Sequence, residues 1–283
     1  MKKISFLIPT FNRFTLTRDL VFELYCQTKA SKWYHDVEII VCDNSSDFNQ
    51  KKCLSQYISQ LDDFVIFHDT GCDIGPTENW IKCIEYSNSE FLLFVYSDDF
   101  IYPYSVDILL NKIYKNNVDL VFFSTSIGTS INDALLYRNP TYFAHLQKSE
   151  FLRMFLSSEN ITHSPASFVF RRSLFVEDDL SQILFIFEGA IKYGAGSDVL
   201  FCYNIFKNAD FKKIINIDKV LMLFRNHENS FTSNKDSNYI VTKTTLQTKI
   251  YLAKLHYGLL FYLRVFLNHQ LNYITIKRRM KLW

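Results

Sequence analysis

The stretch FLLFVYSDDF, residues 91–100, decides the fold, because an apolar run of strand length stops at two adjacent carboxylates. A buried strand tolerates no unpaired charge in its interior, so Asp98 and Asp99 are expected where the strand ends. Open α/β sheets present ligand-binding groups at this end of their strands. An isolated Asp-Asp pair equally suits a loop or the cap of the helix expected from Ser105, so the neighbouring elements decide between these interpretations.

Three apolar runs precede this stretch and alternate with helical patterns. Strands are expected at residues 4–8, 37–42 and 64–68, and helices at about 15–27, 49–60 and up to residue 86. Such a β-α-β-α-β series predicts parallel strands joined by right-handed crossovers. The strand ends near Thr10, Asp43 and Asp98 would then share one edge of one sheet. Helix capping alone does not explain acids repeated at that edge.

The rest of the chain is patterned less regularly. Further strands are expected at residues 118–123, 167–172 and 214–224, and helices at about 105–116, 150–156 and 199–206. The strand at 167–172 is expected to lead out of the first half. Residues 124–143 are polar and irregular, which favours a loop over the site. A long helical pattern rich in Leu, Tyr and Phe covers about 240–273 and is followed by KRRMKLW, residues 277–283.

The composition of the 283 residues is typical of a globular protein. Hydrophobic residues make up 48% and aromatic residues 17%, which excludes a disordered chain. A net charge of only +2 does not indicate a nucleic-acid-binding protein. With 7 Gly and 5 Pro, long elements are favoured over the many tight turns of a barrel or sandwich. The 6 cysteines form no CxxC pair and predict reduced core thiols, not a metal site or a disulfide framework.

The chain is expected to be cytoplasmic. No apolar run reaches the roughly 18 residues that span a bilayer, and the first residues lack the pattern of a signal peptide. The basic and aromatic residues 277–283 suit contact with anionic lipid headgroups at the inner face of the membrane. The alternative is a charged terminus that is simply solvated.

Four motifs follow one another in a specific order: IPTFNR at residues 8–13, DNSS at 43–46, Gly75 with Asn79, and the acidic pair with Pro103 four residues on. Together they resemble the family 2 glycosyltransferases of the GT-A fold. The resemblance covers about the first 105 residues, and weaker matches at Asp198 and residues 225–230 extend it to about residue 232.

This resemblance implies an α/β fold of GT-A type, with a Rossmann-like, mostly parallel sheet, flanking helices and a C-terminal helical extension. The glycosyltransferase domain would cover residues 1–232, with a nucleotide-binding half at 1–123 and an acceptor half at 124–232. The basic helical extension would cover residues 233–283.

The implied reaction is an inverting transfer of a sugar from a nucleotide-sugar donor to a hydroxyl of a growing surface glycan. Capsule or lipopolysaccharide chains, free or lipid-linked, are the implied acceptors. A carboxylate at Asp43 could accept a hydrogen bond from a pyrimidine ring N–H, which favours a UDP- or dTDP-sugar and leaves the choice between them open. The residues implied on the donor side are Thr10, Asn12, Arg13, Asp43, Asn79, Asp98 and Arg225.

The family's acidic motif usually reads Asp-x-Asp-Asp, and here Tyr96 stands at the position of the first acid. The resemblance makes Asp99 a ligand of a divalent metal, Mn²⁺ or Mg²⁺, with His227 as a further ligand. It makes Asp198 the general base, with Ser197 where the family often has Glu. The alternatives are purely structural roles: a helix cap for Asp198 and a hydrogen-bonded loop histidine for His227.

Two other functions stay open at this point. A sugar-nucleotide nucleotidyltransferase also uses a doubly wound sheet with a metal-binding Asp, although such enzymes generally have a glycine-rich phosphate loop and residues 9–13 contain no glycine. A non-catalytic glycan-binding or scaffold relative would explain the changed residues Tyr96 and Ser197. Donor turnover separates both from a transferase.

Overall fold

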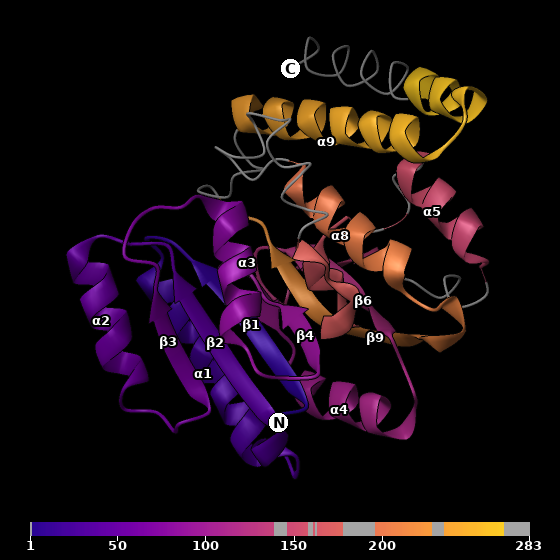
Figure 1. Ribbon diagram of the computed structural model, residues 1–283. Coiled ribbons are helices and arrows are strands. Elements are labelled where there is room, and N and C mark those ends of the chain that lie inside the picture. The colour runs from indigo at the N-terminus through magenta and orange to yellow at the C-terminus, as the bar shows by residue number, and fades with distance from the viewer. Residues whose placement is uncertain are drawn as a thin grey trace.

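The computed structural model describes residues 2–138, 146–157, 161, 163–177, 196–227 and 235–268, with only the backbone described at 235–241. Within these residues one sheet of nine strands forms the core, in the order β3-β2-β1-β4-β8-β6-β9-β5, with β7 paired to β6. Helices cover this sheet (Figure 1). The α/β class expected from the sequence is thereby confirmed.

The first half is a regular βα series with parallel strands. β1 and β2 are buried along their whole length, as the uninterrupted apolar runs predict. In the parallel register, Thr10 at the end of β1 stands opposite Asp43 at the end of β2, and Leu7 stands opposite Phe94 of β4. The elements are β1 (Ile4–Thr10), α1 (Phe14–Ala30), β2 (Val37–Asp43), α2 (Phe48–Ile58), β3 (Val65–Asp69), α3 (Pro76–Tyr86) and β4 (Phe91–Phe94).

The acidic pair follows β4 and does not cap a helix. Helix α4 (Ser105–Lys115) has Tyr104 as its N-cap residue, without a side-chain capping hydrogen bond. Asp98 and Asp99 instead lie between β4 and the short strand β5 (Phe100–Ile101). Because β1, β2 and β4 are parallel, the acidic pair lies at the same sheet edge as Thr10 and Asp43.

The expected loop at residues 124–143 is wrong at 124–128 and 135–138, which belong to strands. Strand β6 (Leu120–Gly128) extends into this range as far as Gly128, and β7 (Leu135–Arg138) pairs antiparallel to β6. The polar residues Ser124, Thr125 and Ser126 gave the stretch its loop-like composition, but all three are buried in the sheet. Residues 139–143 lie outside the described part of the chain.

Strand β8 (Phe168–Arg171) does not lead out of the first half but lies inside the sheet. It pairs antiparallel to both β4 and β6 and so joins the two halves. Arg171 donates hydrogen bonds to Glu90, before β4, and to Asp119, before β6, so its charge is balanced from both sides. The remaining elements of this half are α5 (Lys148–Ser157), α8 (Ser197–Asn208) and β9 (Ile214–Arg225).

The C-terminal helical pattern forms two helices instead of one. α9 (Lys235–His256) ends before Gly258, and residues 259–268 are helical again. Glycine is a poor helix former, which explains a break that the apolar periodicity did not show. α9 packs across α5 and α8 (Figure 1). The basic residues 277–283 lie outside the described part.

Two further expectations concern the cysteines and membrane-spanning helices. The cysteines are unpaired as predicted, but only Cys42, Cys83 and Cys202 are buried, whereas the other three are exposed; the expectation of core thiols is therefore wrong for half of them. Within the described residues, no helix has the length and apolar character that crossing a bilayer requires.

Candidate active site

Two loops at the carboxyl edge of the sheet are tied together by a short hydrogen-bond chain. Asn12 and Ser45 have left-handed backbone angles, with φ of 52° and 59°. The Asn12 N–H donates to Ser46 Oγ at 2.7 Å, and the Asp47 N–H donates to Asn12 Oδ1 at 2.7 Å. Ser46 in turn donates its hydroxyl and its backbone N–H to the two carboxylate oxygens of Asp43. The β1–α1 loop is thus fixed against the β2–α2 loop.

Asp43 is completely buried at the centre of this chain. Burial raises the pKa of its carboxyl above the ordinary value, and the hydrogen bonds from Ser46 oppose that rise. Both carboxylate oxygens accept hydrogen bonds from Ser46. Here Asp43 shapes the loop, and its direct contact with a nucleotide base stays a prediction.

Thr10, at the end of β1, and Asn79, in α3, are also buried. The Thr10 hydroxyl lies 2.7 Å from Thr17 Oγ1, so it holds the start of α1. The Asn79 amide donates to the carbonyl of Cys42 at 3.2 Å, while its Oδ1 is buried without a hydrogen-bond partner. Such an unsatisfied buried acceptor is costly, and a polar group reaching this edge could satisfy it.

The acidic pair, Asp98 and Asp99, contacts three residues expected at the site: the Arg13 side chain, the His227 ring and the Arg225 backbone. Arg13 Nη1 lies 2.7 Å from Asp98 Oδ2, and His227 Nε2 lies 3.1 Å from the same oxygen. The backbone N–H of Arg225 donates to Asp99 Oδ1 at 3.1 Å. Residues more than a hundred positions apart therefore converge on one pair of carboxylates.

Asp99 is nearly buried, with 7% of its surface exposed. Burial and the neighbouring charge of Asp98 raise the pKa of the Asp99 carboxyl well above its usual range, and Arg225 and Arg13 oppose this. A divalent cation would relieve the repulsion between the two acids, and oxygen ligands suit Mg²⁺ or Mn²⁺. The donor set fits such an ion. No group of three or more His, Cys, Asp or Glu side chains assembles within the described ranges, so substrate oxygens would have to complete the shell.

Tyr96, at the position of the missing acid, is a buried aromatic residue on which the charges of both Asp198 and Asp99 act. Its ring packs against Trp80 with 5.4 Å between the ring centres. Burial, together with the charges of Asp198 and Asp99, raises its pKa well above that of an ordinary tyrosine, and a hydrogen bond with Ser164 acts in the opposite direction. Tyr96 is therefore a neutral neighbour of both carboxylate sites and supplies no metal-binding oxygen anion.

Asp198 lies in the first turn of α8. The N-cap residue is Gly196, with φ of 78°, and not Asp198, whose Oδ1 accepts from the Val199 N–H at 2.9 Å. Ser197, where the family often has Glu, is buried with its hydroxyl 2.7 Å from Thr77 Oγ1 of α3. Burial raises the pKa of the Asp198 carboxyl to about 6. A partly exposed carboxylate with this pKa can accept a proton near neutral pH.

Helix α9 contributes a buried lysine, Lys249, which was not among the site residues expected from the sequence. A Cβ atom built on Gly196 would come within 2.7 Å of Thr248 Oγ1, so α9 presses directly on the start of α8. The next residue, Lys249, is 1% exposed, and its charge lowers the pKa of Asp198 against the effect of burial. A signal existed: Lys249 shares the helix face of Leu246 and Ala253, where a buried apolar residue is expected.

The fold defines a class of protein: a mixed α/β protein of GT-A type, with a mostly parallel sheet in its first half. A sequence profile of the family described as "Glycosyl transferase family 2" matches residues 5–177, more than half of the chain. The chain belongs to glycosyl transferase family 2.

Curated relatives match a shorter part of the chain. The abequosyltransferase RfbV of Salmonella typhimurium is 26% identical over 106 residues, 38% of this chain. A GalNAc(5)-diNAcBac-PP-undecaprenol beta-1,3-glucosyltransferase of Campylobacter jejuni is 27% identical over 112 residues, 40% of this chain. The matched stretches span 31% and 35% of the two relatives' own lengths.

Solved structures share the fold along nearly the whole chain. S. aureus TarS 1–349 in complex with UDP-GlcNAc superposes with a TM-score of 0.61 at 15% identity, over 94% of this chain and 79% of that one. Glucosyl-3-phosphoglycerate synthase from Mycobacterium tuberculosis, in complex with Mn²⁺, UDP and phosphoglyceric acid, gives a TM-score of 0.56 at 14% identity, over 91% and 80%. These likenesses confirm the GT-A type fold.

Proposed function

We propose that this protein is an inverting glycosyltransferase that moves a sugar from a UDP- or dTDP-sugar to a hydroxyl of a growing bacterial surface glycan. The observation that carries the proposal is the convergence of Arg13, His227 and the Arg225 backbone on the acidic pair. The two carboxylates are thus surrounded by hydrogen-bond donors and cations that suit the binding of a diphosphate. Family membership supports transfer over the nucleotidyltransferase alternative.

On the donor side, the residues of this chain bind and orient the nucleotide. Asp98 and Asp99 would hold a divalent metal, Mn²⁺ or Mg²⁺, with His227 as a further ligand. When bound, the metal supplies positive charge to the departing nucleoside diphosphate. Arg13 would contact a phosphate once Asp98 turns to the metal, because a guanidinium pairs well with phosphate oxygens. Complexes of TarS with UDP-GlcNAc and of the mycobacterial synthase with Mn²⁺ and UDP support this assignment.

On the acceptor side, Asp198 would take the proton of the attacking hydroxyl. The hydroxyl then attacks the anomeric carbon from the face opposite the leaving diphosphate, which inverts the configuration. Ser197 is tied to Thr77 and cannot provide the second carboxylate of the family pattern. Acceptor selection therefore depends on other residues in the acceptor half. The alternative of an inactive glycan-binding relative is favoured by no contact in the described site.

The acceptor is proposed to be a glycan on a lipid carrier at the inner face of the cytoplasmic membrane. The printed name of the Campylobacter relative, an undecaprenol-linked glycan glucosyltransferase, supports this acceptor class. The basic residues 277–283 would bring a cytoplasmic enzyme to that surface, as a peripheral contact.

Thermal-shift measurements with nucleoside diphosphates test the donor part of this proposal. Because a ligand that binds only the folded state raises the melting temperature, UDP or dTDP with Mn²⁺ is expected to stabilise the protein more than either nucleotide with EDTA. GDP and ADP serve as the matched controls and should have a smaller effect. Equal shifts for all four nucleotides, or none, would contradict a pyrimidine donor site.

The pH dependence of turnover is expected to follow Asp198. A general base must be ionised, so kcat should fall as pH decreases through about 6, the raised pKa of this carboxyl. Lys249→Met removes a cation that lowers this pKa, so the acid limb of the kcat profile should move to higher pH. Among the residues that the structure describes, the other titratable groups acting on Asp198 are Tyr96 and Cys202, and burial raises the pKa of both far above this range.

Lys249→Arg keeps the charge and should restore the wild-type limb, while Lys243→Met, at an exposed position of the same helix, is the matched control. If the acid limb of the kcat profile stays at the same pH in Lys249→Met, the charge of Lys249 does not influence the pKa of Asp198.

A further inference from the structure

The helix at residues 259–268 exposes an apolar face. Its leucines are strongly exposed: Leu259 by 70%, Leu260 by 85%, Leu263 by 42% and Leu267 by 58%. At 100° per residue these four side chains fall within an arc of about 100°, and together they are called the leucine face. Val265, on the opposite side, is fully buried. The helix thus has apolar residues both against the protein and toward the outside.

Exposure of this kind indicates an interaction surface. A surface helix ordinarily turns charged or polar residues outward, whereas here consecutive turns present leucine. The helix is held in place from behind, because Val265 and Phe261 pack against the core. Leu255, at the end of α9, adds a further leucine that is 54% exposed, four residues before Leu259.

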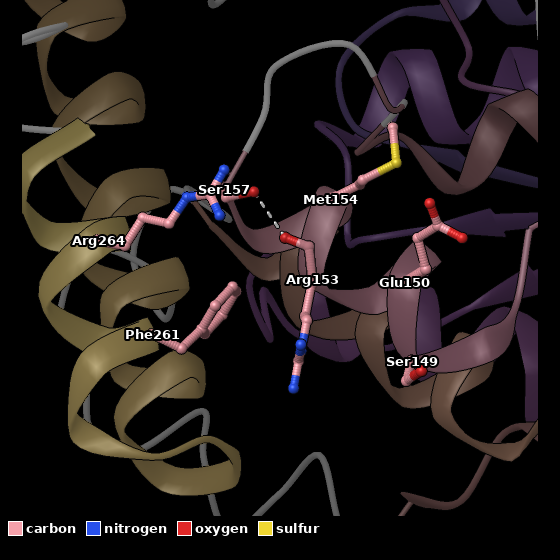
Figure 2. Close-up of a pocket in the computed structure, with 7 residues that line it drawn as sticks. All are labelled: Ser149, Glu150, Arg153, Met154, Ser157, Phe261 and Arg264. Atoms are coloured by element: carbon pink, nitrogen blue, oxygen red, sulfur yellow. Dashed lines mark hydrogen bonds between the residues drawn. The ribbon is translucent and has the colours of Figure 1, made fainter.

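A cationic pocket borders the leucine face. The pocket has a volume of about 360 Å³ and lies between α5 and the helix at 259–268 (Figure 2). Arg264 projects from that helix beside the leucine arc, and the Arg153 guanidinium of α5 lies 5.8 Å from the centre of the Phe261 ring. Glu150 is the acidic residue of the pocket lining. The lining residues are Ser149, Glu150, Arg153, Met154, Ser157, Phe261 and Arg264.

We propose that the leucine face docks on an anionic bilayer, with its leucines in the acyl-chain boundary and Arg153 and Arg264 contacting net-anionic lipid headgroups. Apolar residues beside cations are the pattern of a helix that lies in the membrane interface. The sequence beyond this helix adds four cations within residues 277–283, which strengthens the complementarity to anionic lipid. A second copy of the chain on this face would instead bring the arginines beside the two leucine faces close together, and their like charges would repel.

This docking surface deepens the proposed membrane location but does not depend on the transfer chemistry. It is tested with the full chain and vesicles of phosphatidylglycerol and phosphatidylcholine by co-sedimentation. The double variant Leu260→Glu, Leu263→Glu should lower the partition into anionic vesicles by about tenfold or more, because two apolar contacts become charged. The matched control is Leu135→Glu, Leu136→Glu, which changes two leucines of β7 that are 72% and 61% exposed.

A second pair of measurements examines the charges. Arg153→Gln with Arg264→Gln should weaken binding to phosphatidylglycerol vesicles and leave the weaker binding to pure phosphatidylcholine unchanged. Equal loss from both kinds of vesicle would contradict the contacts of these two arginines with net-anionic headgroups.

Three results would overturn the docking surface itself. The first is equal partition of the leucine variant, its control and the wild type. The second is a change in oligomeric state of the leucine variant without vesicles, which would assign the face to a contact between copies. The third is a lower melting temperature with unchanged vesicle binding, which would mean that other residues of the chain cover the face. Transfer to a water-soluble acceptor should continue in the leucine variant, so a failure of docking and a failure of the proposed reaction are distinguishable.

Discussion

Asp198→Asn is expected to lower kcat by about 10²–10⁴-fold, the range that a positioned general base contributes. The amide keeps the size of the side chain and can still accept the Val199 N–H through its oxygen, but it cannot take a proton from the acceptor hydroxyl. The measurement is steady-state turnover with a saturating donor. Donor affinity, measured by calorimetry, should stay close to that of the wild type, because the acidic pair is unchanged.

The control for this substitution is Asp62→Asn. Asp62 is an exposed acid whose contact is a surface ion pair with Lys29, so its loss should leave turnover unchanged. Wild-type kcat in Asp198→Asn would show that another group accepts the proton. Loss of donor binding together with kcat would instead mean that the substitution disturbs the fold around α8.

Asp99→Ala is the second large effect and acts on the donor. In the presence of Mn²⁺ it should weaken binding of the nucleoside diphosphate by at least about 10–100-fold, since changes even in the outer shell of a metal site reach this size. The substitution also leaves the Arg225 N–H without the carboxylate that it contacts. Calorimetry with UDP or dTDP measures the effect.

The same titration in EDTA provides the control. Without a metal, the wild type and Asp99→Ala should bind the nucleotide with similar, weak affinity, and Asp62→Ala should resemble the wild type in both buffers. An affinity that is unchanged by Asp99→Ala in Mn²⁺ removes this carboxylate from the metal site.

The regular first half could be predicted from local pattern. β1, β2 and β4 are buried runs that end beside polar groups, so alternation along the chain was enough to place Thr10, Asp43 and Asp98 at one edge. Boundaries differed by a few residues, because the end of an element depends on cap geometry that periodicity does not record. The buried polar residues 124–126 were missed for a related reason: composition alone cannot tell a buried serine from one in a loop.

The rest of the site depends on contacts between distant residues. No local pattern shows that His227 comes to Asp98, or that Ser197 meets Thr77 across 120 positions. The predicted roles of His227 and Asp198 came from the resemblance to a family. Lys249 was hidden in an apolar helix, and only the packing of α9 on Gly196 brings it near Asp198. The division at residues 123 and 232 stays a prediction, although the sheet continues across the first boundary.

The most direct test of the proposed reaction is nucleoside diphosphate release from a panel of UDP- and dTDP-sugars, with Mn²⁺ and a lipid-linked glycan acceptor. The proposal predicts that one donor releases its diphosphate in an acceptor-dependent way, with a glycan extended by one sugar of inverted anomeric configuration, and that Asp198→Asn lowers the rate of formation of both products by about 10²–10⁴-fold. Nucleotide binding without release from any donor of the panel would contradict it and favour an inactive glycan-binding protein. Release of pyrophosphate from a nucleoside triphosphate and a sugar phosphate would favour a nucleotidyltransferase.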